Sequence, residues 1–424
     1  MPRPQSSFAP VEDPASGWFG LVPAYRLASF RTGVAVLTLV FHVPKFSGII
    51  RDYAASAFHV PPAFAWLPVL TPSSGALLIG LQYLAATGLL LGLGASACAW
   101  ILAGAGFYVL LLDPEHYSHN AHFHLTLLAL IGCSGDRISL PRLIGGGDAD
   151  ARCPAWPERL VRVQVAIVFF YAALDKVLSP FWGFSGRRLA SLRMAEHGPG
   201  LDWIRRLNQA ATHTAPAALS VATIAVEFFL AVAALVRPLW RVGLTVGFLF
   251  IAYLEFLVKP GLFTWDMFAA GLLFLPAGDG GWLVHHDPRC PACRRTQAVL
   301  LRLDWLRRLR GIPREHDSGL PRDVASFELV SPHGRTIRGF DAVRVLPALL
   351  AGPAFVTMAL ARFGGDFLRV RGFGPWDVLP YLLLTGYLAL WVPGMDRVLD
   401  QPLRAALGAH ADGPRRLDPP PSRV

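Results

Sequence analysis

Two pairs of residues in this chain have types and spacing that suit chemistry, and the first is an aspartate beside a lysine in an apolar segment. Asp175 and Lys176 lie near the end of the run QVAIVFFYAALDKVLSPFWGFSG, residues 164–186. A charged side chain inside a membrane costs several kcal/mol unless it has a polar partner, so the pair is a candidate site. The alternative is that Lys176 reaches the lipid headgroups and Asp175 neutralises it near the helix end.

The second pair is Cys290 and Cys293, which come after a short apolar strand and open a basic amphipathic helix. A thiol at a helix N-terminus among arginines is stabilised as thiolate, and a second thiol one turn later can resolve a mixed disulfide. Two other interpretations stay open, namely half of a zinc site completed by His285 and His286, and a motif without a present role. The other cysteines form no disulfide framework: Cys98 and Cys133 lie in apolar runs and Cys153 in a loop.

A third polar stretch is a connection between two apolar segments that is rich in histidine. A spacing of three residues would place three of these rings on one helical face, which suits a metal ion, but no HExxH pattern accompanies them. We therefore expect no metal there, and predict a polar cluster at the mouth of a membrane cavity. The stretch contains His116, His119, Asn120, His122 and His124.

Two apolar segments farther along the chain each hold one carboxylate. Glu227 is a candidate partner for Lys176 or for the histidine cluster. Glu255 is a second candidate, or else it pairs with Lys259 one turn later.

Composition indicates what kind of element must position these groups. Of 424 residues, 53% are hydrophobic and only 16% charged, and the mean hydropathy is +0.43, so the chain is expected to be a multi-pass protein of the cell membrane. The net charge of +10 comes from arginine-rich segments, as expected for loops at an anionic membrane face. We expect the lipid bilayer as a partner and no nucleic acid, because no basic and aromatic surface pattern is present.

The apolar runs predict an α-helical bundle of roughly seven to ten membrane spans. Small residues between them permit close helix contacts, and glycines at 92–94 predict a break between two spans. The expected spans are residues 27–43, two within 74–112, the helix that contains Lys176, 217–236, 239–258, 261–278, 345–361 and 378–392.

Several blocks, in this order, resemble one family. HNAHFHLTLLALIGCSGDRISL, VFFYAALDKVL, the glutamate in ATIAVEFFL and GLFTWDMFAAGLLFLP together resemble the HTTM domain, the transmembrane domain of vitamin K-dependent gamma-carboxylase and its bacterial relatives. The resemblance covers residues 24–278 and implies that Lys176 is the base that deprotonates a hydroquinone, so a quinol is the expected cofactor or substrate. Asn120 matches the family's asparagine with His122 beside it, and with Asp175 and Glu227 these are the expected substrate-binding residues.

The resemblance to the carboxylase stops before its large β-rich extramembrane region, so it favours a quinol-like or other lipid-soluble substrate over glutamate carboxylation. In place of that region the chain has the CxxC stretch, then VASFELV, the turn SPHG, RTIRG and FDAVRVLPALL, which predict a β-hairpin followed by a helix. This succession resembles the DCC thiol-disulfide oxidoreductase family, which is also found attached to HTTM domains. It implies a thioredoxin-like fold in which Cys290 and Cys293 exchange electrons with a thiol-disulfide redox partner.

We therefore predict an all-α polytopic membrane bundle with a small C-terminal α/β thioredoxin-like domain. The expected activity is membrane redox chemistry on a quinol-like substrate, and the alternative is a non-enzymatic scaffold that binds or transports a lipid or small molecule. A cavity that joins Lys176 to Asn120 and Glu227 favours chemistry. The expected domains are a flexible tail (1–23), the bundle (24–278), the CxxC domain (281–345), one or two membrane helices (346–396) and a basic disordered tail (397–424).

Overall fold

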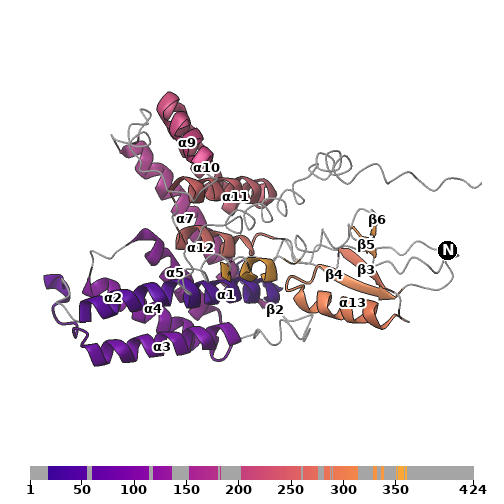
Figure 1. Cartoon of the computed structure of the whole chain (residues 1–424), viewed down its shortest axis with the longest axis horizontal. Coiled ribbons are helices and arrows are strands. Elements are labelled where there is room, and N and C mark those ends of the chain that lie inside the picture. The colour runs from indigo at the N-terminus through magenta and orange to yellow at the C-terminus, as the bar shows by residue number, and fades with distance from the viewer. Residues whose placement is uncertain are drawn as a thin grey trace, which may run out of the picture.

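A computed structural model describes most of the chain up to residue 360. The described residues are 18–54, 60–113, 118–135, 152–179, 182, 202–258, 261–275, 281–286, 288, 290–313, 328–331, 336–338, 350, 352–357 and 359–360. The predictions for His116, for the span at 378–392 and for the C-terminal tail lie outside them. Figure 1 shows a bundle of helices with a small sheet and one helix at its end, beside β2.

The first apolar stretch is one long helix with a widened turn. Helix α1 (Ala24–Leu37) continues through a π-helix, η1 (Thr38–His42), into α2 (Val43–Ala54). Pro44 has no N–H to donate to the carbonyl of Val40, and its ring crowds that carbonyl. The wider π-helical turn immediately before this proline accommodates the missing bond.

The next three helices pack through small residues. Helix α3 (Pro72–Leu91) and helix α4 (Ala95–Leu112) are separated by Gly92 and Gly94, whose φ angles of 73° and 55° confirm the predicted break. Helix α5 (His119–Ser134) lies against α4, where a side chain on Gly106 would collide with Leu125.

The described part of the second half of the bundle contains five helices. They are α7 (Trp156–Leu178), α9 (Asp202–Thr214), α10 (Pro216–Leu235), α11 (Trp240–Val258) and α12 (Leu262–Gly271). In the described part of the chain, four helical stretches are long and apolar enough to cross a membrane: Ala24–Asp52, α3, α4 and α10. Helix α7 carries several charges and α12 is short, so the seven to ten spans stay a prediction. Helix α9 was not predicted, because we interpreted residues 187–206, which contain five arginines, as a loop.

The small domain is a four-stranded sheet with one helix. Its elements are β3 (Trp282–His286), α13 (Pro291–Leu303), β4 (Leu309–Pro313), β5 (Glu328–Val330) and β6 (Thr336–Arg338). The strand order is β4-β3-β5-β6, with β3 parallel to β4 and antiparallel to β5. Strand β3, helix α13 and the hairpin of β5 and β6 lie where the sequence predicted them, whereas β4 was not predicted. The helix predicted after the hairpin lies outside the described residues, apart from residue 350. Burial raises the pKa of Asp304, which comes directly after α13, while Arg308 opposes this shift.

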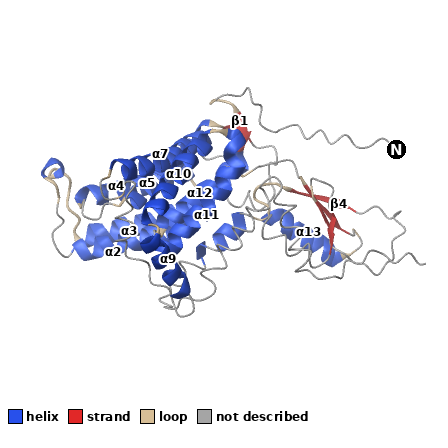
Figure 2. Ribbon diagram, turned by 90° about the horizontal axis from the view of Figure 1, so that it is seen from above, coloured by secondary structure: helices blue, strands red, loops and turns tan. Residues whose placement is uncertain are grey.

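The small domain is attached to the bundle by apolar contacts. Trp305 and Leu306, just beyond α13, belong to the hydrophobic core of the bundle. Gly352 lies against Trp305, and Phe355, in a helical segment at 352–357, has its ring centroid 6.0 Å from that of Trp265 in α12. Figure 2 shows the domain beside the bundle from above.

A two-stranded sheet joins the start of the first helix to the start of α7. Strand β1 (Leu21–Pro23) pairs antiparallel with β2 (Arg152–Pro154). Cys153, which we expected in a loop, is therefore buried in β2, opposite Val22. The pairing fixes the N-termini of α1 and α7 at the same end of the bundle.

Candidate functional site

Helices α7 and α10 bring Lys176 and Glu227 together. Their packing places Lys176 Nζ 2.8 Å from Glu227 Oε1, and Nζ also donates to the carbonyl of Ala172 at 3.1 Å. The ring centroid of Trp182 lies 5.2 Å from Nζ. The two side chains are only 14% and 6% exposed, so this is a mostly buried ion pair. It is one of the pairings that the sequence left open.

The other three predicted substrate-binding residues lie in more open positions. Asp175, next to Lys176, is exposed on α7. Asn120 is partly buried in the first turn of α5, and His122 is exposed with its ring edge against Phe107 of α4, at 5.6 Å between centroids. Their role in substrate binding stays a prediction.

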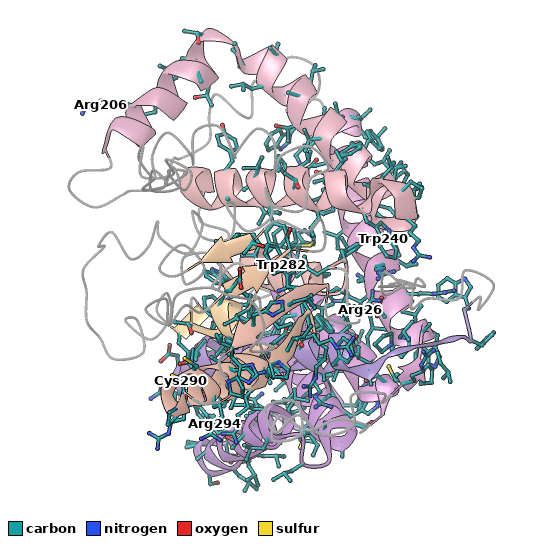
Figure 3. The ribbon with its side chains drawn as sticks, turned by 90° about the vertical axis from the view of Figure 1, so that its right-hand side faces the viewer. Arg26, Arg206, Trp240, Trp282, Cys290 and Arg294 are labelled. Atoms are coloured by element: carbon teal, nitrogen blue, oxygen red, sulfur yellow. The ribbon has the colours of Figure 1, made fainter. Side chains whose placement is uncertain are left out.

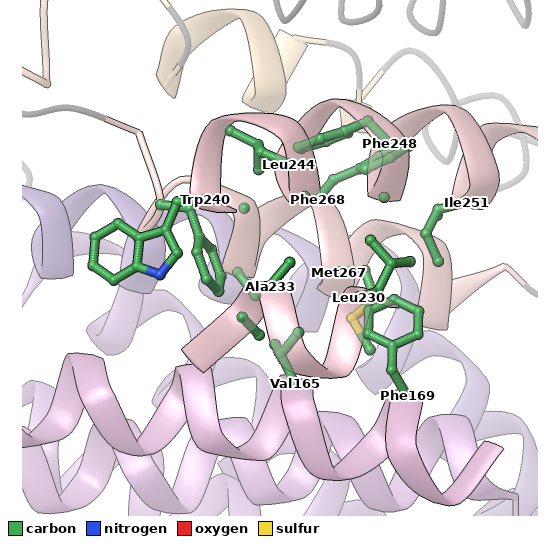
Figure 4. Close-up of a pocket in the computed structure, with 16 residues that line it drawn as sticks. Val165, Phe169, Leu230, Ala233, Trp240, Leu244, Phe248, Ile251, Met267 and Phe268 are labelled. Atoms are coloured by element: carbon green, nitrogen blue, oxygen red, sulfur yellow. The ribbon is translucent and has the colours of Figure 1, made fainter. Parts of the chain in front are cut away.

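An apolar cavity lies between α7, α10, α11 and α12 (Figure 4). Its empty space is about 480 Å³, which includes space open to the surroundings, and none of the residues that line it is ionisable. Gly243 and Gly247 of α11 face α10 and let the two helices approach closely beside it. The lining residues are Val165, Phe169, Leu230, Ala233, Ala234, Trp240, Gly243, Leu244, Gly247, Phe248, Ile251, Met267, Phe268, Ala270, Gly271 and Phe274.

Helix geometry places the ion pair beyond one end of this cavity. Lys176 lies seven residues after Phe169, which is two turns on the same face of α7 and about 10 Å along its axis. Glu227 precedes Leu230 by three residues and so shares its face of α10. Both lining residues therefore lead toward the Lys176–Glu227 pair.

A second charged cluster lies beyond the other end of the cavity. Arg162 stacks on the ring of Trp240, 3.6 Å from its centroid, and donates to Glu158 and to the carbonyl of Leu273, the latter at 2.6 Å. Arg26 binds the same carboxylate at 3.2 Å. Lys176 lies 14 residues after Arg162 in α7, which is about 21 Å along the helix axis, so the two charged clusters lie far apart along α7.

The CxxC motif occupies the N-terminus of α13. Cys290 is the N-cap residue, and its Sγ accepts a hydrogen bond from the backbone N–H of Cys293 at 3.2 Å. The two Sγ atoms are 2.6 Å apart, and both side chains are partly buried. Arg294, labelled with Cys290 in Figure 3, is exposed one residue later. This geometry favours the thiolate of Cys290.

A polar cluster that the sequence analysis did not predict is buried within the bundle. His124 of α5 joins Asp266 of α12 through Nδ1 and Oδ1, 2.8 Å apart, and its Nε2 lies 3.1 Å from Thr38 Oγ1 in η1. The ring of His42 lies 4.7 Å from that of His124. The sequence did contain a signal, because Asp266 lies inside the apolar run 261–278 and a charged residue in such a run is a candidate site residue. No group of three His, Cys, Asp or Glu residues within the described ranges has the geometry of a metal site.

Comparison with known proteins assigns the bundle but not the small domain. Residues 22–278 match the HTTM domain, and this match covers more than half of the chain. No curated protein and no solved structure matches the chain. The matched region contains the Lys176–Glu227 pair, the cavity and the His124–Asp266 pair, whereas the CxxC motif lies outside it.

Proposed function

The chain belongs to the HTTM domain family, and on that premise we propose that it is a multi-pass membrane enzyme that binds a quinol-like, lipid-soluble substrate beside Lys176. The family makes it a membrane protein related to the carboxylases. The observation that carries the proposal is the buried Lys176–Glu227 pair at the end of an apolar cavity. In a soluble protein such a pair would be structural in most cases, but within a membrane bundle it is a candidate site by default.

The proposed chemistry is proton transfer. Glu227 accepts one proton from the Lys176 ammonium across their 2.8 Å contact, which leaves a neutral amine. The amine then takes the proton of the substrate's phenolic O–H, so that a phenolate remains beside a lysine that is again charged. Trp182 supports this end state because an aromatic face stabilises a nearby ammonium.

The cavity supports the choice of a lipid-soluble substrate. Its walls are aliphatic and aromatic side chains from four helices, which suit an apolar ring or tail. Phe169 and Leu230 direct such a molecule along α7 and α10 toward the pair. A charged or strongly polar substrate would lose its hydration there without finding partners.

For the small domain we propose thiol-disulfide exchange in a thioredoxin-like fold. The support is a parallel β3–α13–β4 unit with a CxxC at the start of its helix, together with an antiparallel hairpin on the other side of β3. The Cys290 thiolate attacks a partner's disulfide, and Cys293 displaces the partner from the mixed disulfide. The partner leaves as a dithiol while Cys290 and Cys293 become a disulfide, so two electrons pass to the partner.

The second candidate function is a non-enzymatic scaffold that binds or transports a lipid or small molecule. The absence of ionisable residues from the lining of the cavity favours it, because convergent polar groups are expected where a reaction occurs. The two functions differ in one respect: only the enzyme changes the protonation state of the molecule that it binds.

The test is the absorbance spectrum of menaquinol bound to the protein in lipid nanodiscs, under anaerobic conditions. We expect a phenolate band in the wild type that is lost in Lys176→Ala and Glu227→Gln, and that persists in Lys45→Ala, an exposed lysine of α2. Cys290→Ser should keep the band and lose thiol exchange with a small disulfide. Binding without any phenolate in the wild type would favour the scaffold, and no binding would contradict both functions.

A further inference from the structure

The buried cluster around His42 has features of a binding site that the proposed function does not use. His42 ends the π-helix η1, and single π-helical turns inside α-helices occur often at functional sites. Its ring stacks on Phe46, with 4.3 Å between centroids, and is 1% exposed. Neither ring nitrogen has a hydrogen-bond partner among the residues that the structure describes. Buried polar groups are nearly always bonded, so this ring requires a partner.

The neighbouring histidine cannot be that partner. Thr38 Oγ1 donates its one hydrogen to the carbonyl of Val34 at 2.8 Å, so it accepts from His124 Nε2. His124 Nδ1 is bound to Asp266, whichever of the two carries the proton between them. Both nitrogens of His124 are therefore engaged, and His42 must bond to a group outside this chain of hydrogen bonds.

A second buried side chain, on an adjacent helix, also lacks hydrogen-bond partners within the described residues. Gln82 lies on the buried face of α3, the helix that packs against α1 and η1, and it is fully buried. Within the described part of the chain neither its amide nitrogen nor its amide oxygen has a hydrogen-bond partner. One oxygen of Asp266 and the hydroxyl of Ser47 in α2 are likewise without one there. Polar side chains on η1, α2, α3 and α12 therefore each have at least one buried atom without a hydrogen bond within the described residues.

We propose that His42 and Gln82 bind a hydroxyl group, supplied either by an internal water or by a lipid-soluble alcohol or phenol. A hydroxyl both donates and accepts, which matches a neutral imidazole with one donor and one acceptor and an amide with both. A water in such a site needs two to four polar partners, and the two ring nitrogens of His42 with the amide of Gln82 offer that many groups. A metal ion does not fit, because no group of three suitable ligands exists within the described ranges.

The test asks whether replacing His42 or Gln82 by an apolar residue lowers or raises the midpoint of thermal denaturation. His42→Phe and Gln82→Leu replace the polar groups with apolar ones of similar size. If a hydroxyl is bound, each variant leaves it and the opposite side chain without a partner, and we expect each to lower the midpoint of thermal denaturation by about 2–4 °C. Because they share one ligand, the double variant should lose less than the sum of the two. His213→Phe, at an exposed histidine of α9, is the matched control and should change little.

An empty site gives the opposite result. Removing polar groups that are buried and unbonded stabilises a protein, so a raised midpoint in either single variant would overturn the proposal. A second measurement needs no variant: nitrogen NMR of labelled histidine in the wild type should show both His42 ring nitrogens hydrogen-bonded. Ring nitrogens without a hydrogen bond would also overturn it.

The two sources of the hydroxyl are separated by extraction. If the ligand is a lipid-soluble alcohol or phenol, mass spectrometry of an organic extract should find one compound in the wild type and in His213→Phe but not in His42→Phe. If the ligand is water, the extracts should be identical and the His42 nitrogen signals should shift on exchange into D₂O. Either result supports the site and identifies its ligand.

Discussion

The bundle contains two buried polar sites that differ in how their groups are satisfied. Lys176 and Glu227 carry opposite charges and bind each other at 2.8 Å, so each charge has a partner, although Glu227 Oε2 has no hydrogen bond within the described residues. At the other site His42 has no partner among the described residues, although His124 and Asp266 beside it are bonded to each other. The comparison indicates that the first site can act on a molecule that arrives from the cavity, whereas the second must hold a ligand to be stable.

Among the variants that test this comparison, we expect Glu227→Ala to have the largest effect on the free energy of unfolding. It leaves a mostly buried ammonium without its carboxylate, and we expect the free energy of unfolding to fall by roughly 3 kcal/mol, measured by denaturant titration in detergent. The double variant Lys176→Met/Glu227→Leu removes both charges and should restore most of that loss while abolishing the phenolate band. A double variant as unstable as the single one would show that the charges are not the cause.

The next effect concerns the cavity that distinguishes the first site. A side chain at Gly243 would begin 2.5 Å from Cβ of Ala233, so Gly243→Leu should cost roughly 1–3 kcal/mol by overpacking and abolish menaquinol binding. Gly104 of α4 faces open space, and Gly104→Leu is the matched control that should retain both stability and binding. Equal menaquinol affinity in the wild type and Gly243→Leu would place the substrate elsewhere.

A smaller effect is expected from Asp266→Asn at the second site. The amide N–H of asparagine can donate to His124 Nδ1, whose ring already donates through Nε2 to Thr38, so we expect a loss of about 1 kcal/mol in the free energy of unfolding. A loss as large as that of Glu227→Ala would mean that His124 and Asp266 are also an ion pair, and the contrast between the two sites would fail.

The smallest effect on stability is expected outside the bundle, at Cys290→Ser. The side chain is only partly buried, so the free energy of unfolding should change by less than about 0.5 kcal/mol. Thiol exchange with a small disulfide, monitored by the release of a coloured thiol, should nevertheless be lost. Cys133→Ser, at an exposed cysteine of α5, should keep the exchange. Loss of the exchange in Cys133→Ser but not in Cys290→Ser would show that Cys133, and not Cys290, is the reactive thiol.

Local patterns predicted much of the fold. Apolar runs located α3, α4 and α10, the glycines at 92 and 94 located the break between two helices, and turn residues located the hairpin of β5 and β6. Each of these signals is carried by residues close together in the sequence.

The elements that were missed depend on distant contacts. Strand β1 has three residues and no alternating pattern, and it forms only because β2, far along the chain, lies beside it. Helix α9 is amphipathic and arginine-rich, which resembles a loop in composition. The pairing of His124 with Asp266 joins residues 142 positions apart, so composition and spacing could not predict it. In contrast, Lys176 and Glu227 were both noticed because charges are rare in apolar runs.

The most direct test of the account is where a photoactivatable menaquinone analogue attaches to the protein in nanodiscs. We predict that labelling maps to cavity residues of α7, α10 and α11, that excess menaquinol prevents it, and that it is lost in Gly243→Leu but not in Gly104→Leu. Labelling confined to the exposed leucines of α3, or labelling that Gly243→Leu leaves unchanged, would contradict the claim that the substrate binds beside Lys176 and Glu227.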